Sequence, residues 1–258
     1  MPLAHFADAA TKALNAEQEK DRALVMLDID ARLVDLDAMG VDIQVVAPAP
    51  PQCYYSVPVN IAERAHRIAN EGVAEYVARR PERFVGLGVT TMQEPDVAVR
   101  DLETAITKLG LKGVQILTSV NGEELSDKKY LPFFAKAEEL SAFVMMHPNG
   151  FTHADRLTHF YFNNVLGNPL ETTIALHNLI FNGTLARFPS LKLMAVHGGG
   201  YLPAYSGRID HAWGARADAH GELSLPPTTY LRQAYLDTVV FTEHQLAYPS
   251  RSSGLIGS

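Results

Sequence analysis

The feature that most constrains the fold is a series of six short apolar runs, separated along the chain by longer segments that read as helices. The runs cover residues 41–48, 83–90, 113–119, 142–148, 191–197 and 235–241. Each run is nearly continuous in apolar residues, which is typical of strands covered on both faces. The sequence therefore predicts a parallel sheet.

Helical patterns fill the intervals between these runs. They cover residues 30–40, 59–81, 94–110, 129–140 and 169–189. The segment 94–110 opens with acidic residues and ends in Lys-Leu-Gly, which matches the helix dipole and a glycine stop. Alternating strands and helices indicate right-handed βαβ units, which form either a (β/α) barrel or an open doubly wound sheet. No Gly-x-Gly-x-x-Gly follows the first run, which argues against a dinucleotide-binding sheet.

Size and charge limit the partners of such a domain. The 258 residues can form a single domain, 1–258, and carry a formal net charge of −7. The chain lacks the basic cluster that a phosphate backbone requires, so we expect no nucleic-acid partner. No apolar run reaches the roughly 18 residues needed to cross a bilayer, so we expect no membrane contact. The single cysteine, Cys53, fits a reducing cytoplasm and has no activating base nearby in the sequence.

Two of the six runs finish on or beside a histidine. His147 is followed by Pro-Asn-Gly, and His197 is followed by three glycines. A lone histidine at such a position is most often structural. Parallel strands of a barrel, however, present their C-terminal ends to one mouth, so histidines on consecutive strands can reach a common ligand. Glycine lets that ligand approach the backbone closely, and the pair therefore predicts a functional site.

The chemistry of imidazole suits such a mouth. Its ordinary pKa lies near neutral pH, so a histidine there can exchange protons with a substrate or with water. The other histidines are better interpreted as structural or surface residues. His66 and His177 fall inside predicted helices, and a surface role is favoured for His211 over a place in the pocket.

Longer stretches around the two histidines carry a family resemblance. They cover residues 36–48, 113–140, 145–150, 168–193 and 193–213. In this order they resemble the amidohydrolase-2 family, in particular its decarboxylases of muconate-type and aromatic acids. The resemblance implies a (β/α)8 TIM barrel of the metal-dependent hydrolase superfamily. It also implies a divalent metal at the strand ends, usually zinc and sometimes manganese.

The resemblance assigns roles to single residues. His147 matches the metal ligand on the fifth strand of the family, and His197 matches the sixth-strand histidine that acts as general acid or base. The resemblance also implies candidates for substrate binding around the same mouth: Tyr54, Tyr55, Asn149, Arg208 and Arg216. Arg216 matches a residue that reaches the substrate carboxylate from a neighbouring subunit, which implies a homodimer. Asn164 stands where relatives often have a pocket tryptophan, so a muconate-semialdehyde substrate is not implied.

The two ends depart from the family pattern. The family places His-x-His at the end of its first strand and a metal-binding aspartate after Gly-Ser at the end of its eighth. Here His5 can serve as the second histidine, with Leu3 in place of the first, and the sequence ends in Gly-Ser. Residues 7–19 predict a helix. We therefore expect an incomplete barrel, with no first strand in residues 1–24 and no eighth after Ala247, and weak or no metal binding by this chain.

Three functional hypotheses follow from these observations. The first is a metal-dependent decarboxylase that acts on a small aromatic or muconate-like carboxylic acid. The second is a metal-dependent hydrolase of the same superfamily. The third is a catalytically silent barrel fragment with a binding or dimerisation role. A metal-free lyase that uses His197 alone is less favoured.

Overall fold

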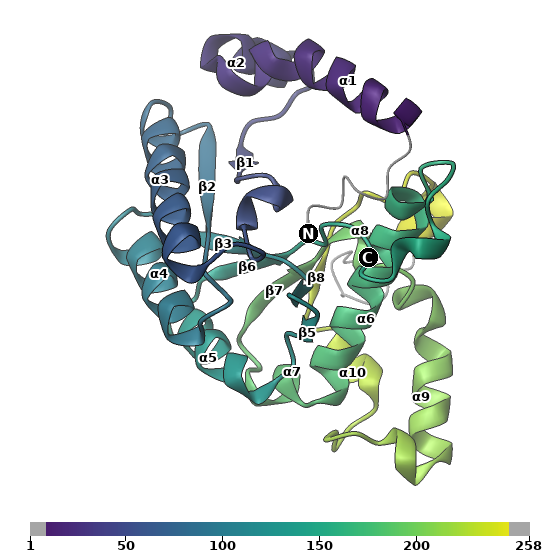
Figure 1. Ribbon diagram of the computed structural model, residues 1–258. Helices are drawn as coiled ribbons and strands as arrows, with labels where there is room; N and C mark the ends of the chain where they lie inside the picture. Colours follow the sequence, from purple (N-terminus) through teal and green to yellow (C-terminus); the bar gives the residue numbers. More distant parts are fainter. Residues whose placement is uncertain (1–8, 248–258) are drawn as a thin grey trace.

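The computed structural model describes residues 9–247, and its centre is a six-stranded parallel sheet (Figure 1). The strands are β1 (Gln44–Val46), β2 (Phe84–Val89), β3 (Gly113–Ile116), β6 (Phe143–Met146), β7 (Lys192–Ala195) and β8 (Tyr235–Leu236). Their order in the sheet is β1-β2-β3-β6-β7-β8, and every neighbouring pair is parallel. This open sheet, which follows chain order, confirms the predicted α/β class and the incomplete barrel.

Helices connect the strands and cover the sheet. They are α1 (Ala9–Leu27), α2 (Ile29–Ala38), α3 (Val59–Ala78), α4 (Pro95–Thr107), α5 (Leu131–Glu139), α6 (Asn168–Phe181), α7 (Thr184–Arg187), α8 (Val196–Gly199), α9 (Ser206–Ala215) and α10 (Pro227–Leu231). A short hairpin of β4 (Ser119–Val120) and β5 (Glu123–Glu124) follows β3. Figure 1 shows α3, α4 and α5 side by side along the sheet, as expected for successive βαβ units.

The predicted helices form where local signals favour them. Asp28 caps α2 by accepting a hydrogen bond from the Ala31 amide at 2.8 Å. Proline occupies the first turn of α4, where its missing N–H costs nothing, and Asp96 there complements the helix dipole. The predicted helix 169–189 divides into α6 and α7, because Gly183 adopts a left-handed conformation with φ 73°.

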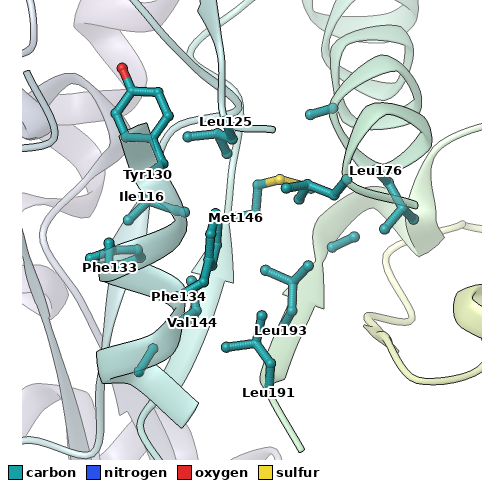
Figure 2. Packing of buried hydrophobic residues seen from close by; sticks show 14 of the residues in the cluster. Ile116, Leu125, Tyr130, Phe133, Phe134, Val144, Met146, Leu176, Leu191 and Leu193 are labelled. Carbon is teal, nitrogen blue, oxygen red and sulfur yellow. The ribbon is translucent and has the colours of Figure 1, made fainter. Parts of the chain in front are cut away.

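The core lies between the sheet and its helices. Figure 2 shows Phe133 and Phe134 from α5 packed on one side of the strand residues, with Leu176 from α6 on the other. The strand side chains between them are fully buried: Ile116, Val144, Met146 and Leu193. Close packing extends to the backbone at Gly113, where an added Cβ would lie 1.8 Å from the Phe143 carbonyl oxygen. A side chain at this position would therefore separate β3 from β6.

The last predicted strand is much shorter than expected. We predicted residues 235–241, but β8 covers Tyr235–Leu236. The prediction was wrong after Leu236 because the backbone there turns away from the sheet, with the Val239 amide bonded to the Asp237 side chain at 3.2 Å. The run 191–197 likewise ends as a strand at Ala195, and its last two residues open α8, which is a turn rather than a regular helix because His197 and Gly198 have non-helical φ and ψ.

The N-terminal part folds as the sequence suggested for the residues that are described. The helix predicted at 7–19 is present as α1, Ala9–Leu27, so residues 9–24 contribute no strand. Leu3 and His5, and the segment after Ala247, lie outside the described residues, so the predictions made for them stay predictions. Within residues 9–247, no helix has both the length and the hydropathy needed to cross a membrane.

Candidate active site at the strand ends

His147 and His197 meet at the C-terminal edge of the sheet. His147 follows β6 and His197 follows β7, which are adjacent parallel strands. The centroids of the two imidazole rings lie 5.2 Å apart, with the ring planes at 64°. This confirms the prediction that the two histidines occupy neighbouring strand ends. Their chemical roles stay predictions at this point.

The orientation of His147 is fixed by its own loop. Its Nδ1 lies 2.6 Å from the Pro148 carbonyl oxygen. Because a carbonyl oxygen only accepts, Nδ1 carries the proton, which leaves a lone pair on Nε2 of the neutral ring. Burial lowers the pKa of His147, against an opposing effect from the Pro148 carbonyl and the Asp237 charge. A neutral imidazole whose Nδ1–H is held by a carbonyl is the form that binds a metal through Nε2.

His197 is also held in its neutral form. Its pKa is lowered to about 4, mainly by burial and also by the neighbouring His147, while the Asp237 charge opposes both effects. The sequence suggested a pKa near neutral, and the structure corrects that value because the ring is partly removed from water beside a second imidazole. The Thr172 hydroxyl lies 3.2 Å from Nδ1 of His197 and can hold that side of the ring.

The backbone around His197 is left-handed over four consecutive residues. The φ angle is 59° at His197, 60° at Gly198, 76° at Gly199 and 67° at Gly200. At Gly200 an added Cβ would lie 2.3 Å from the Pro169 carbonyl oxygen and 2.4 Å from the Thr173 hydroxyl. Glycine is therefore required at Gly200 by both conformation and space. Here Gly200 lies against α6, and the predicted approach of a ligand to these glycines stays a prediction.

Sequence reasoning missed Asp237, the first residue after β8. Its Oδ2 accepts a hydrogen bond from the His197 amide at 3.0 Å, and its Oδ1 accepts one from the Gly198 amide at 2.7 Å. Three neighbouring strands, β6, β7 and β8, thus each place a titratable residue at or just past their C-terminal end. The strand-end rule that found the two histidines could have found Asp237, had the strand been known to end at Leu236.

A cavity of about 860 Å³ opens beside His197. Its walls come from the turn after β7, from the start of α6 and from the segment after β8, and they include Asn164, Tyr201, Val239 and Phe241. His197 lines this cavity and His147 does not, so the prediction that both rings face one cavity is not confirmed. The cavity is large enough for a small aromatic acid.

Four further residues were predicted from the sequence to bind the substrate, and they differ in how exposed they are. Tyr54 is partly exposed in a left-handed turn and stacks on His66, with ring centroids 6.1 Å apart, whereas Tyr55 is buried in the core. Asn149 is half-buried in the loop that follows His147. Arg208 is exposed on the first turns of α9. For all four, the role in substrate binding stays a prediction.

Arg216 stands apart from the histidine pair of its own chain. It follows α9, a helix of 10 residues that begins just after the His197 turn, so it lies roughly 15 Å along that helix. Figure 1 shows α9 projecting beyond the sheet. The guanidinium is exposed and binds Asp218 through two hydrogen bonds, of 2.9 Å and 2.6 Å. The predicted role of Arg216 at the site of a neighbouring subunit stays a prediction.

Cys53 and His66 form a buried structural group. Burial raises the pKa of the Cys53 thiol to about 12, which disfavours the thiolate and agrees with the lack of an activating base nearby in the sequence. The His66 ring donates from Nε2 to the Cys53 carbonyl at 2.8 Å and accepts at Nδ1 from the Thr91 hydroxyl at 2.9 Å. His66 therefore fastens the loop after β1 to the end of β2.

The described residues provide part of a metal site. Between residues 9 and 247, no group of three or more His, Cys, Asp or Glu side chains is arranged to hold a metal ion. His147 provides one oriented nitrogen, whereas both carboxylate oxygens of Asp237 bind backbone amides. A catalytic zinc site normally has three protein ligands. Further ligands would have to come from outside these residues, where His5 lies.

An incomplete (β/α) barrel with titratable residues at its C-terminal edge defines a class of proteins whose functional residues gather at the strand ends. Within that class the chain belongs to the amidohydrolase family, whose model matches residues 4–247. The chain is 34% identical to the 2-amino-3-carboxymuconate-6-semialdehyde decarboxylase of Dictyostelium discoideum over 223 residues, which are 86% of this chain and 62% of that protein. It thus spans less than two thirds of the length of this relative.

Solved structures show the same fold. The 5-carboxyvanillate decarboxylase of Sphingomonas paucimobilis superposes with a TM-score of 0.80 at 30% identity, over 86% of this chain and 68% of that one. A dihydroxybenzoic acid decarboxylase from Polaromonas sp. JS666, with bound manganese and the inhibitor 2-nitroresorcinol, gives a TM-score of 0.83 at 26% identity. That match covers 96% of this chain and 81% of the other.

Proposed function

We propose that the protein is a metal-dependent decarboxylase that acts on a small aromatic or muconate-like carboxylic acid. The observation that carries this proposal is the meeting of His147 and His197 at adjacent strand ends, with ring centroids 5.2 Å apart, beside a cavity of about 860 Å³. The decarboxylase relatives support it. The reaction breaks a carbon–carbon bond, releases CO2 and leaves a carbanion that must take up a proton.

His197 is the proton-transfer group in this proposal. Its lowered pKa keeps the ring neutral at pH 7, so it can accept a proton from substrate or water and return it to the carbanion carbon. The Thr172 hydroxyl at 3.2 Å fixes the ring while the proton moves. Partial burial of the ring limits the access of water, which would otherwise compete for that proton.

His147 is the metal ligand in this proposal. Its Nε2 is oriented by the bond from Nδ1 to the Pro148 carbonyl. A divalent ion held there would supply polarisation of the substrate's oxygen atoms. Manganese is our first choice, because it is bound in the Polaromonas relative, and zinc is the second. His5 is the further ligand that we propose from the sequence.

Cationic and polar side chains recognise the carboxylate of the substrate. Arg208 lies at the start of α9, and Arg216 lies at its far end, where it would reach the site of a second subunit. We therefore propose a homodimer in which each subunit completes the site of the other. Tyr54 and Asn149 are proposed as additional contacts, whereas the burial of Tyr55 in the core argues against that role for it. The single cysteine agrees with our assignment to the cytoplasm.

A silent barrel fragment is the second candidate, and one observation favours it. The described residues offer one oriented metal ligand and no complete set. A metal-dependent hydrolase of the same superfamily would use the same edge of the sheet. Activity and metal content together separate these possibilities.

The test is CO2 release by the purified chain with Mn²⁺ or Zn²⁺ added. The substrates are 2,6-dihydroxybenzoate, 5-carboxyvanillate and 2-amino-3-carboxymuconate-6-semialdehyde. Because we expect this chain to bind metal weakly, we expect turnover of at least one of them only when the metal is in excess. A folded protein that releases no CO2 from any of the three, with either metal, would contradict the proposal and favour the silent form.

A further inference from the structure

His197 lies in a backbone conformation that a side chain beyond glycine rarely adopts. Its φ and ψ are 59° and 38°, and those of Gly198 are 60° and 25°. Glycine tolerates this region freely, whereas the Cβ of His197 crowds its own backbone there. Residues in such strained conformations persist only when their surroundings hold them. The turn therefore needs contacts that keep it left-handed.

Asp237 provides such contacts from another strand. One carboxylate oxygen accepts from the His197 amide at 3.0 Å, and the other accepts from the Gly198 amide at 2.7 Å. Successive amides that point toward one anion form a concave binding site, and hydrogen bonds to a charged acceptor are stronger than neutral ones. The carboxylate is itself fixed, because its Oδ1 also accepts from the Val239 amide at 3.2 Å.

The opposite side of the turn is held by α6. The Tyr201 amide donates to the Thr173 hydroxyl at 2.8 Å, and that hydroxyl donates to the Pro169 carbonyl at 2.7 Å. Thr172, the preceding residue, contacts the His197 ring at 3.2 Å. Asp237 thus fixes the backbone of His197 from β8, while α6 fixes the glycines and the ring.

We propose that Asp237 is a positioning residue that holds His197 in its left-handed turn and thereby sets the place of its imidazole beside the cavity and His147. Asp237 is not among the residues that line the cavity, and both of its oxygens are occupied by amides. Its effect on catalysis is therefore exerted through His197 and rests on the function proposed above. The hydrogen bonds themselves can be tested without activity.

The kinetic test is Asp237→Asn, which keeps the size of the side chain but replaces one acceptor by a donor that faces an amide. A displacement of about 1 Å can lower turnover by about 100-fold, so we expect kcat to fall by up to that factor with little change in KM. The matched control is Asp210→Asn. Asp210 makes two similar bonds, to the Thr228 amide at 3.0 Å and to its hydroxyl at 2.6 Å, away from the turn.

If Asp237 served only general stability, both variants would lower the melting temperature and leave kcat unchanged at a temperature where they are folded. That result would overturn the proposal. A selective fall of kcat in Asp237→Asn, with Asp210→Asn close to the unmodified chain, supports it.

If Asp237→Asn does not fold, or if no substrate is found, the hydrogen bonds of Asp237 can still be measured in the unmodified chain. NMR couplings across the hydrogen bonds should connect the amide nitrogens of His197 and Gly198 with the Asp237 carboxyl carbon. Amide hydrogen exchange should be slow at both residues. Fast exchange at both amides, without the couplings, overturns the role of Asp237. Slow exchange with the couplings, in a chain that turns over none of the three acids, leaves the Asp237 contact standing and removes the proposed function instead.

Discussion

At the residue scale, the protonation of His197 connects the site to the stability of the whole chain. The folded structure lowers the pKa of this histidine from 6.5 to about 4, mainly by burial. Burial also lowers the pKa of His147, His66 and His177. All four rings therefore favour the neutral form in the fold, and they take up protons more readily in the unfolded chain.

We predict that the free energy of unfolding falls as the pH is lowered from about 6.5 toward 4. In this range the unfolded chain binds more protons than the folded one, so acid favours unfolding, and the contribution of His197 is fully present only above 6.5. The measurement is the urea midpoint as a function of pH, for the unmodified chain and for His197→Gln. The variant should show the weaker dependence. Equal slopes in this range would show that His197 has an ordinary pKa in the fold.

At the element scale, apolar runs predicted where strands exist better than where they end. All six strands of the parallel sheet lie inside predicted runs, because a strand covered on both faces needs apolar residues throughout. The ends depend on contacts between distant residues, such as that of Asp237 with the amides of His197 and Gly198. A hydrophobic pattern contains no information about such contacts.

The same contrast applies to the site. His147 and His197 could be paired from the sequence because sheet order follows chain order, so that consecutive strand ends become neighbours. Asp237 could not be found in the same way, because it appeared to lie inside a strand. The left-handed conformation of His197 was equally hidden, since three glycines after a histidine do not show where the turn begins.

The turn that follows β7 and packs against α6 gives a direct prediction at this scale. Gly200→Ala should lower the free energy of unfolding by about 1–3 kcal/mol, because φ is +67° and the new Cβ would lie 2.3 Å from the Pro169 carbonyl oxygen. Chemical denaturation measures this. The control is Gly207→Ala in α9, where nothing lies within 4 Å of an added Cβ, and stability should be unchanged or rise by up to about 1 kcal/mol. Equal effects at both glycines would contradict the described turn.

At the scale of the whole molecule, the described sheet is open, and we propose that two subunits contribute residues to each active site. The described sheet ends at β1 and β8, so two strand edges have no partner within residues 9–247. Unpaired edges favour association with another chain. Arg216, at the far end of α9, is the residue that we expect to cross to the neighbouring subunit.

Mixing two inactive variants tests this arrangement. His197→Ala and Arg216→Ala should each lack most of the activity when assayed alone. If each site uses His197 of one subunit and Arg216 of the other, mixed dimers contain one intact site, and activity should return after unfolding and refolding the two together. Mixtures that stay as inactive as the separate variants would contradict a shared site, and so would a monomer in light scattering at working concentration.

The assignment of separate roles to two adjacent histidines is the central claim, and one paired measurement tests it most directly. Turnover and bound metal are measured for the unmodified chain, His147→Ala and His197→Ala, after equilibration with the same concentration of Mn²⁺. We predict that His197→Ala loses turnover by at least about 100-fold but keeps the metal level of the unmodified chain, because it loses a proton-transfer group and no ligand. His147→Ala should lose both metal and turnover. Loss of metal in His197→Ala, or full turnover in either variant, would contradict the account.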